Sequence, residues 1–476
     1  MRRDYSRSYN RRTRTAVRSL ITLEVFEQHP HKVIVTIGAV FVLAYLLAAL
    51  AFPRAHGRIV NGDAIQYYSY LRSLAIDRDV DFSNEYAELY LPTGDDGAPN
   101  VWLTRKTPTG RPANMMSIGP GILWSPFFAA AYLFAILVRA VGINMPLDGY
   151  SLPFVLSAGV AGIVYATLGA HFCYRSCRLV FDSRPAFWAT ITAWLATPAV
   201  YYSVISPAYS HAPSFFAMSL FVYVWLETRH RDDVARYVVL GLLAGLATLV
   251  RWQDAIILIL PGFQLASAIA TRRMSLSAAV LRGIVLVAGV AVMLLPQFLA
   301  WRSIYGEFFV LPQGEGFMRW TDPAIAAVLF SLRHGLFSWT PAVLLSIAGL
   351  AWLVRRDALL GWASIAILAV AVYVNASVSD WWAGAAFGAR RFVGYTVFFA
   401  LGFAAAYSSD TWRRPVWLAR AVAAGLVLYN LLFVLQYQVF MRGFVGLVPY
   451  PTTARQVLVD RLVLPWQLLR AWLDGS

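Results

Sequence analysis

Residues 61–68 read Asn61-Gly62-Asp63-Ala64-Ile65-Gln66-Tyr67-Tyr68, shortly after the first long apolar run of the chain, residues 33–52. Between Asp63 and Ile76 the apolar residues recur at helical spacing, at positions 64, 65, 68, 71, 74 and 75. This pattern predicts an amphipathic helix lying on a membrane surface, with Asp63 at its amino end, where free backbone amides favour a carboxylate. The rest of the chain is interpreted outward from this acidic position.

The composition is that of a membrane protein. Hydrophobic residues make up 59% of the 476 residues. Several apolar runs approach the roughly 20 residues that a helix needs to cross a bilayer. We therefore predict an all-α polytopic membrane protein. The two cysteines, Cys173 and Cys177, are one helical turn apart and suggest neither a disulfide framework nor a four-ligand metal site.

Eleven apolar runs are predicted to cross the membrane. They are residues 33–52, 151–174, 186–205, 212–227, 236–250, 254–270, 283–301, 335–354, 358–376, 392–408 and 417–440. A further apolar segment, 118–141, begins Ile118-Gly119-Pro120-Gly121 and contains Pro126. These residues suit a segment that does not cross completely.

The arginines predict the orientation of these spans. The net charge is +15, nearly all of it from arginine, and arginine accumulates in the cytoplasmic loops of membrane proteins, so we infer no nucleic-acid partner. The basic connections contain Arg175/Arg178/Arg184, Arg229/Arg231/Arg236, Arg272/Arg273/Arg282, Arg355/Arg356 and Arg413/Arg414. If these connections and the basic tail 1–32 share the cytoplasmic side, then 118–141 is re-entrant or interfacial on the outer side. If 118–141 crosses, all of them face outward. We favour the first arrangement, with the amino terminus inside and the carboxyl terminus outside.

This topology divides the chain into four parts. They are a cytoplasmic basic tail (1–32), a transmembrane module (33–301) that includes a long outer loop (53–150), a second outer loop (302–334), and a carboxyl-terminal transmembrane region with an outer tail (335–476). The unusual polar residues then fall on the outer side, which indicates a functional site there.

The acidic residues of the first outer loop have two interpretations each. Asp63 is either a general base, which removes a proton from an attacking hydroxyl, or a simple helix cap. Asp77, Asp79 and Asp81 offer hard oxygen ligands to a divalent cation, or form a solvated turn. The sequence leaves metal dependence open.

Arg251 interrupts an apolar stretch, and a charge in such a place is costly enough that function is the first hypothesis. It either pairs with Asp254 or holds a phosphate, which the guanidinium fork fits well. His211 follows Ser210 at a predicted helix start. It either donates a hydrogen bond to a phosphate, acts as an acid or base, or forms a local hydrogen bond.

The stretch 379–391 combines two tryptophans with paired arginines. Trp381 and Trp382 either stack on sugar rings or anchor the chain at the membrane interface. Arg390 and Arg391 either neutralise a phosphate or extend to the interface as part of that anchor. We assign Arg251, Arg390, Arg391 and His211 to phosphate binding, and Tyr67, Trp381, Trp382 and Asp254 to substrate binding.

The pattern resembles the GT-C superfamily of membrane glycosyltransferases, in particular bacterial protein O-mannosyltransferases and lipid A aminoarabinose transferases. The resemblance lies in Asp63 after the first span, in the ending Leu246-Ala247-Thr248-Leu249-Val250-Arg251, and in residues 381–392. Many relatives have Asp-Glu at the acidic motif, whereas here Ala64 follows Asp63. The resemblance implies juxtamembrane helices in the first outer loop.

The resemblance also implies a reaction. It is the inverting transfer of a hexose or pentose from a polyprenyl-phosphate-linked donor to a glycan, lipid or protein acceptor, on the outer face of a bacterial inner membrane, with Asp63 as general base. A flippase or carrier for a lipid-linked glycan is the alternative, and it would need outer arginines too. It predicts discontinuous helices in repeated halves, and the sequence shows no clear internal repeat.

Overall fold

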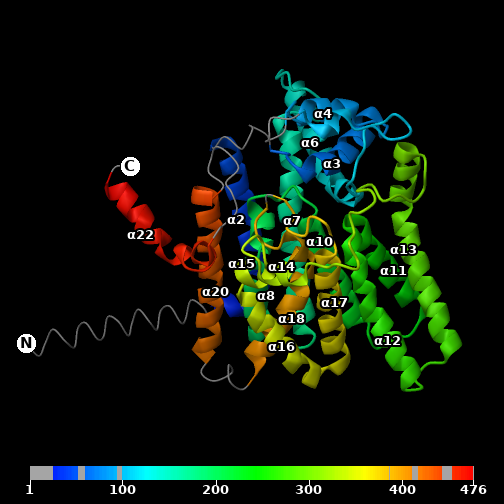
Figure 1. The fold of residues 1–476 in the computed structure, drawn as a ribbon, viewed down its shortest axis with the longest axis vertical. Coiled ribbons are helices and arrows are strands. Elements are labelled where there is room, and N and C mark those ends of the chain that lie inside the picture. Colours follow the sequence, from blue (N-terminus) through cyan, green and yellow to red (C-terminus); the bar gives the residue numbers. More distant parts are fainter. Residues whose placement is uncertain are drawn as a thin grey trace, which may run out of the picture.

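The structure is a computed structural model that describes residues 25–51, 59–93, 99–384, 386–409, 416–441 and 453–474. Within these ranges the chain folds into helices, and the only β-type pairings are isolated bridges (Figure 1). The prediction of an all-α membrane protein is thereby confirmed. Most of the predicted tail 1–32, as well as Arg413 and Arg414, lies outside the described residues.

The long helices follow the predicted apolar runs closely. They are α2 (Pro30–Ala51), α6 (Gly119–Ala140), α7 (Leu152–Arg178), α8 (Ser183–Leu195), α10 (His211–Glu227), α11 (Val234–Val250), α12 (Ile259–Ala270), α13 (Leu276–Tyr305), α16 (Ala342–Arg356), α17 (Ala358–Ala376), α18 (Thr396–Ser408) and α20 (Val416–Gln436). The run 186–205 is divided near Pro198, and the run 335–354 is divided before Pro341, because proline removes a backbone donor from the helix.

Shorter elements form the connections. The α-helices among them are α3 (Asp63–Arg72), α4 (Ser83–Leu89), α5 (Val101–Thr104), α9 (Ala199–Val204), α14 (Ile325–Phe330), α15 (Leu336–Trp339), α21 (Ala454–Leu458) and α22 (Asp460–Leu473). Four single-turn or irregular segments complete them, namely η2 (Ser73–Asp77), η3 (Trp252–Leu258), η4 (Arg390–Tyr395) and η5 (Tyr437–Met441).

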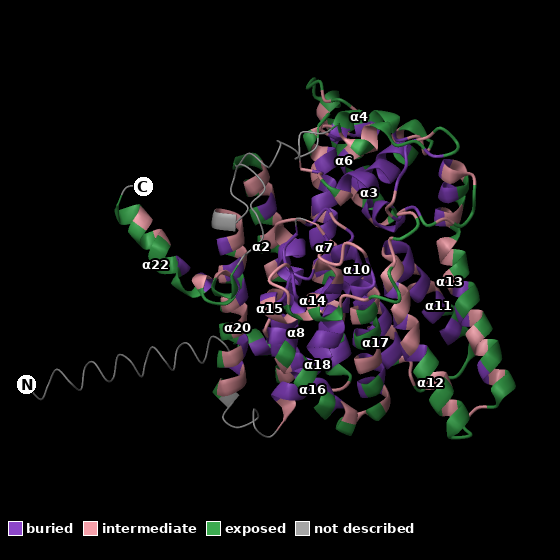
Figure 2. Ribbon diagram, viewed as in Figure 1, coloured by how far each residue is buried: buried purple, intermediate pink, exposed green. Residues whose placement is uncertain are grey.

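Seven helices in the described residues are long and apolar enough to cross a bilayer. Helices α8, α10, α11, α16 and α18 are shorter than the roughly 20 residues of a full span, so the number eleven stays a prediction. In Figure 2 the helices α8, α10 and α18 are mostly buried, whereas α12 and α13 lie at the edge of the bundle. Leu276, Ile284, Leu295 and Leu299 of α13 are exposed there, as a lipid-facing surface requires.

Helices α2 and α7 run in opposite directions. His31 at the start of α2 lies beside His171 near the end of α7, with ring centroids 4.7 Å apart. Tyr45 near the end of α2 contacts Gly159 near the start of α7, so these two helices are antiparallel. The start of α2 and the end of α7 therefore share one end of the bundle.

The arginine-rich connections gather at that same end. The guanidinium of Arg356, at the end of α16, lies 5.2 Å from the ring of Phe181 in the turn after α7. Arg229, in the turn between α10 and α11, forms an ion pair with Asp357 between α16 and α17. We call this the basic end, and define it by residues 175–184, 228–236, 271–282 and 355–358.

Residues 119–140 form the continuous helix α6, and Pro126 within it does not interrupt the helix. The prediction of a re-entrant segment is therefore wrong. Gly119 abuts the Leu249 carbonyl at the end of α11, and Phe128 packs on Phe154 in the first turn of α7, with centroids 5.0 Å apart. Both of these helix ends lie away from the basic end. Helix α6 thus runs along the opposite half of the molecule (Figure 1), and its interfacial position stays a prediction.

Helix α3 begins at Asp63, as predicted, but it does not expose a polar face as an amphipathic surface helix would. Every residue from 64 to 72 is buried, including the polar Gln66, Ser69 and Arg72. The polar face is buried because it finds partners inside the protein: Gln66 accepts from the Met115 amide at 2.8 Å, and Arg72 donates to the Asp148 carbonyl at 2.8 Å. Helix α3 belongs to a second hydrophobic core, which is built mainly from residues 60–135 and is completed by residues of α7, α11 and α13.

Candidate functional site

A cavity of about 390 Å³ lies at the end of α11 opposite the basic end. Its polar lining comes from six separate parts of the chain: Asp63, Tyr67, Ser117, His211, Arg251, Gln253, Gln313, Asp380, Arg390 and Arg391. The structure thus brings together the predicted catalytic residue, all four predicted phosphate-binding residues, and Tyr67.

Asp63 is the first residue of α3 and reaches into the cavity. Its Oδ2 lies 2.9 Å from Nη1 of Arg390, and its side chain is 33% exposed. The residue before the helix is Gly62, and no side chain caps this end. The carboxylate is therefore engaged with an arginine from a distant segment while part of it still faces solvent. This geometry does not support the interpretation of Asp63 as a simple helix cap.

Arg251 follows the last turn of α11, where the backbone becomes extended before η3 begins. Its Nη1 donates to Ser210 Oγ at 3.0 Å and to His211 Nδ1 at 2.9 Å. The hydroxyl of Tyr67 donates to the same Ser210 Oγ at 2.9 Å. Burial raises the pKa of Tyr67, so this hydroxyl stays protonated. One chain of hydrogen bonds thus links α3, α10 and α11.

Of the two alternatives for Arg251, the pair with Asp254 is not what the structure shows. The Asp254 carboxylate accepts from Ser214 Oγ at 2.6 Å, within the core between η3 and α10. Asp254 is buried and does not line the cavity. Arg251 finds its partners at the start of α10 instead, because the extended backbone at this position turns its side chain toward Ser210 and His211.

Arg390 and Arg391 open the short segment η4. Arg391 forms an ion pair with Asp380, at 2.7 Å between Nη2 and Oδ1, and donates to the Asp380 carbonyl at 3.0 Å. The turn before them requires Gly388, which has a φ of 61°. A Cβ at this position would also lie 2.8 Å from Pro198 Cγ. The glycine lets the backbone pass close to Pro198, and the path of this backbone positions the side chains of Arg390 and Arg391 at the cavity.

Trp381 and Trp382 do not line the main cavity. They border a smaller hollow beside it, which also touches Arg390 and Arg391. The guanidinium of Arg333 lies 4.3 Å from the ring centroid of Trp382. The tryptophans therefore support the arginine-bearing segment from behind, and their predicted role in stacking on a sugar remains a prediction.

Sequence reasoning missed three residues of this region. His334 is buried, and its Nδ1 lies 2.6 Å from the Trp382 carbonyl oxygen, so Nδ1–H donates to that oxygen. Burial lowers the pKa of His334 to about 4, and the ring is neutral. Asp380 and Ser210 each adjoin a predicted residue, and this adjacency was the available signal. For His334 the sequence has no comparable signal, because its partner lies in another segment.

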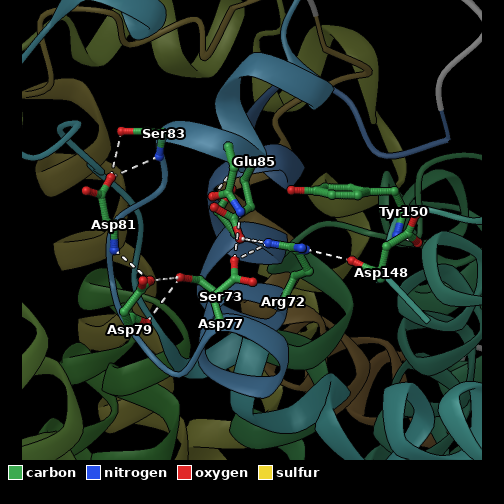
Figure 3. A network of polar contacts seen from close by, with 12 residues as sticks. Arg72, Ser73, Asp77, Asp79, Asp81, Ser83, Glu85, Asp148 and Tyr150 are labelled. Carbon is green, nitrogen blue, oxygen red and sulfur yellow. Dashed lines mark hydrogen bonds and ion pairs between the residues drawn. The ribbon is translucent and has the colours of Figure 1, made fainter. Parts of the chain in front are cut away.

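The metal candidates of the first outer loop bind their own chain (Figure 3). Asp77 forms an ion pair with Arg72, Asp79 accepts from Ser73 Oγ at 2.7 Å, and Asp81 accepts from Ser83 Oγ at 2.6 Å. In the described ranges no group of three or more histidine, cysteine or acidic side chains converges on one point. These three aspartates do not form a cation cage.

The same network buries an acidic side chain. Glu85 of α4 is fully buried, and its Oε1 lies 2.8 Å from Nη1 of Arg72. Burial raises the pKa of Glu85 to about 7. Arg72 also stacks on the ring of Tyr150, with its guanidinium carbon 4.2 Å from the centroid. This cluster fixes the far end of α3, the helix whose first residue is Asp63.

No protein-family model and no curated protein sequence matches this chain. Solved structures resemble it in fold. The archaeal oligosaccharyltransferase AglB from Archaeoglobus fulgidus, in complex with an inhibitory peptide and a dolichol-phosphate, has a TM-score of 0.51 at 13% identity, over 90% of this chain and 61% of AglB. ArnT from Cupriavidus metallidurans, bound to undecaprenyl phosphate, has a TM-score of 0.49 at 15% identity, over 92% of this chain and 72% of ArnT.

Both neighbours belong to the GT-C superfamily. The chain spans about 61% of the length of AglB, so the likeness concerns the shared helical part. This likeness agrees with the resemblance found in the sequence, and the chain has a GT-C-like fold.

Proposed function

We propose that this chain transfers a sugar from a polyprenyl-phosphate-linked donor to an acceptor, with the reacting groups held in the cavity of Asp63 and Arg390. The observation that carries the proposal is that the partly exposed carboxylate of Asp63 and three guanidinium groups line one cavity. A carboxylate suits removal of a proton from an acceptor hydroxyl, and guanidinium groups suit a phosphate. The fold of AglB, whose structure holds a dolichol-phosphate, supports a lipid-linked donor.

The charges around the cavity favour an anion. Arg390 is paired with Asp63, and Arg391 with Asp380. Arg251 has Ser210 and His211 as its hydrogen-bond partners, both of them uncharged when the histidine accepts at Nδ1. Three cations thus face two carboxylates. The surplus positive charge attracts the phosphate of the donor and stabilises the charge that develops on it as it leaves.

The proposed reaction is a single displacement. The acceptor hydroxyl oxygen forms a bond to the anomeric carbon while the bond from that carbon to the phosphate oxygen breaks. Asp63 takes the proton from the hydroxyl, and the electron pair of the broken bond leaves with the polyprenyl phosphate. Attack opposite the leaving group inverts the anomeric configuration. Arg251 and Arg391 hold the phosphate, and Arg390 bridges it to the base.

The apolar lining of the cavity suits the lipid part of the donor. Met116, Leu311, Phe317 and Met318 line it beside the charged groups. An isoprenoid chain buried against them gains about 25 cal/mol for each Å² removed from water. Hydrophobic contact then supplies affinity, while the arginines select the phosphate.

We further propose that the protein lies in a bacterial inner membrane, with the basic end in the cytoplasm and the cavity on the outer side. The gathering of the arginine-rich connections at one end supports this orientation. The sugar is a hexose or pentose. The acceptor is a glycan, lipid or protein that reaches the cavity from the outer side.

The test is transfer by the purified chain in detergent, with a polyprenyl-phosphate-linked sugar and an acceptor extract. Release of polyprenyl phosphate is measured together with acceptor labelling. Asp63→Asn is expected to lower the rate by roughly 10²–10⁴-fold, the usual contribution of a general base. Glu88→Gln, which changes an exposed acid on α4, is the matched control. Normal transfer by Asp63→Asn would remove the base, and donor movement across vesicles without transfer would favour a carrier.

A further inference from the structure

We propose that a second cavity, at the basic end, binds a phosphodiester with one negative charge, as in the headgroup of an acidic phospholipid. This cavity measures about 350 Å³. It lies where the turn between α10 and α11, the end of α12 and the start of α17 meet. The whole length of α11 separates it from the cavity of Asp63, so the proposal does not depend on the proposed reaction.

Arg236 is the reason to expect an anion here. Its side chain is buried, with only 2% of the residue exposed. Nε donates to Thr228 Oγ1 at 3.0 Å, and Nη2 donates to Gln264 Oε1 at 2.9 Å, whereas Nη1 has no hydrogen-bond partner in the described ranges. No carboxylate of those ranges forms an ion pair with it. A buried cation without a counter-charge is strongly unfavourable, so this arginine calls for an anion nearby.

The residues that contact Arg236 also form the wall of the cavity. Its Nη2 lies 3.5 Å from the Trp225 carbonyl oxygen, and its guanidinium carbon is 5.2 Å from the ring centroid of Tyr237. Trp225, Tyr237 and Gln264 all line the cavity. A ligand in this cavity is therefore separated from the guanidinium by a single layer of side chains, a distance at which a buried charge is still felt.

The charged side chains in and behind the cavity wall have a net charge of one positive unit. Arg229 and Asp357 form an ion pair and cancel. Arg273 and Asp232 both line the cavity, and their charges balance one another. Arg236 then remains, because Thr228 and Gln264, to which its side chain donates, are neutral, and the neighbouring Asp233 is paired with Arg231. One negative charge on the ligand restores neutrality, which a phosphodiester supplies.

The surroundings favour a lipid as the source of that phosphate. Phe263 and Ile269 of α12 are exposed on the outside of the bundle, next to the cavity-lining part of the helix. Acyl chains attached to a headgroup in the cavity can lie along this apolar surface. Arginine-rich ends of membrane helices also attract acidic headgroups in general.

The experiment measures lipid binding to the delipidated full-length protein in detergent, by native mass spectrometry and thermal shift. The probes are phosphatidylglycerol, phosphatidylcholine and soluble glycerol phosphate. We expect phosphatidylglycerol to bind with a clear preference over the other two. Equal binding of phosphatidylcholine would overturn the charge argument, and equal binding of glycerol phosphate would overturn the lipid source.

Two substitutions on α12 form a matched pair. Ala268 lines the cavity, and Ala268→Trp fills it without removing any charge. It is expected to weaken phosphatidylglycerol binding by roughly ten- to a hundredfold, because the indole occupies the space of the headgroup. Ala266 is exposed and outside the lining, so Ala266→Trp should bind as the natural protein does. Undiminished binding by Ala268→Trp would place the lipid elsewhere.

Arg236→Gln tests the charge itself. It should abolish the preference for phosphatidylglycerol over phosphatidylcholine while leaving the cavity in place. A preference unchanged by Arg236→Gln contradicts the proposal. If this variant does not fold, the pair of α12 variants decides the question alone.

Discussion

Nη1 of Arg390 lies 2.9 Å from Oδ2 of Asp63. This contact joins the start of α3 to the start of η4, the short segment between α17 and α18. The arginine is 15% exposed and the aspartate 33% exposed, so both groups still face the cavity. An arginine in this position orients the carboxylate toward an incoming hydroxyl and remains within reach of a phosphate. The pair therefore couples the two halves of the proposed chemistry.

Arg390→Gln removes that coupling. We expect transfer to fall by about 10²-fold or more, because a preorganised cation at a developing charge typically contributes that much. Arg390→Lys should recover part of the rate, since it keeps the charge but loses the fork geometry. The check is kcat measured at saturating donor. Equal rates for Arg390→Gln and the natural protein would show that the ion pair is only structural.

Arg251 should act mainly on the donor. Arg251→Gln removes the cation bonded to Ser210 and His211, so the KM for the donor should rise roughly tenfold, with a smaller change for the acceptor. Varying each substrate at a fixed level of the other separates the two effects. An unchanged KM for the donor would count against phosphate binding by Arg251.

Gly388 should tolerate no side chain. Its φ of 61° disfavours other residues, and a Cβ would approach Pro198 to 2.8 Å. Gly388→Ala is expected to cost about 1–2 kcal/mol of stability and to displace both arginines. Thermal unfolding in detergent measures the first effect, and donor KM the second. Gly314→Ala is the control, because Gly314 has a similar φ of 88° but nothing near its Cβ.

Glu85 should make stability depend on pH. Its pKa is about 7 in the folded protein against a reference of 4.5, so the folded state holds a proton that the unfolded state releases. The contribution of Glu85 to the free energy of unfolding is then greatest below pH 4.5. It decreases as pH rises from 4.5 to 7, by up to about 3 kcal/mol.

The measurement compares unfolding temperatures between pH 5 and 8. Glu85→Gln should flatten the decrease, because the amide does not titrate. Glu88→Gln, on the exposed side of the same helix, should leave the decrease unchanged. Identical profiles for the natural protein and Glu85→Gln would mean that Glu85 titrates normally.

Topology can be tested at Val180, in the turn between α7 and α8 at the basic end. In a protein with Cys173 and Cys177 replaced by alanine, Val180→Cys should react with an impermeant maleimide only after the membrane is opened. Lys106→Cys, exposed in the first outer loop, should react in intact cells. Reaction of Val180→Cys from outside would reverse the proposed orientation.

The sequence determined the helical framework almost completely. Apolar runs fixed most helix bounds within a few residues, because hydrophobic periodicity depends on neighbours three or four positions apart along the chain. Local signals also marked Asp63 as a helix start and Arg251 as a break after α11. Both residues are noticeable without any knowledge of the fold, since charges in or beside apolar stretches are rare.

Only the tertiary structure decided which polar atoms meet. The sequence did not pair Asp63 with Arg390 or Arg391 with Asp380, and it offered Asp254 to Arg251 where the protein uses Ser210 and His211. It also predicted an exposed polar face for α3, whereas Asp148 and Glu85 hold its Arg72 in a buried network. Such partners come from distant segments, and the packing of whole helices sets their distances. Spacing along the chain carries no record of that packing.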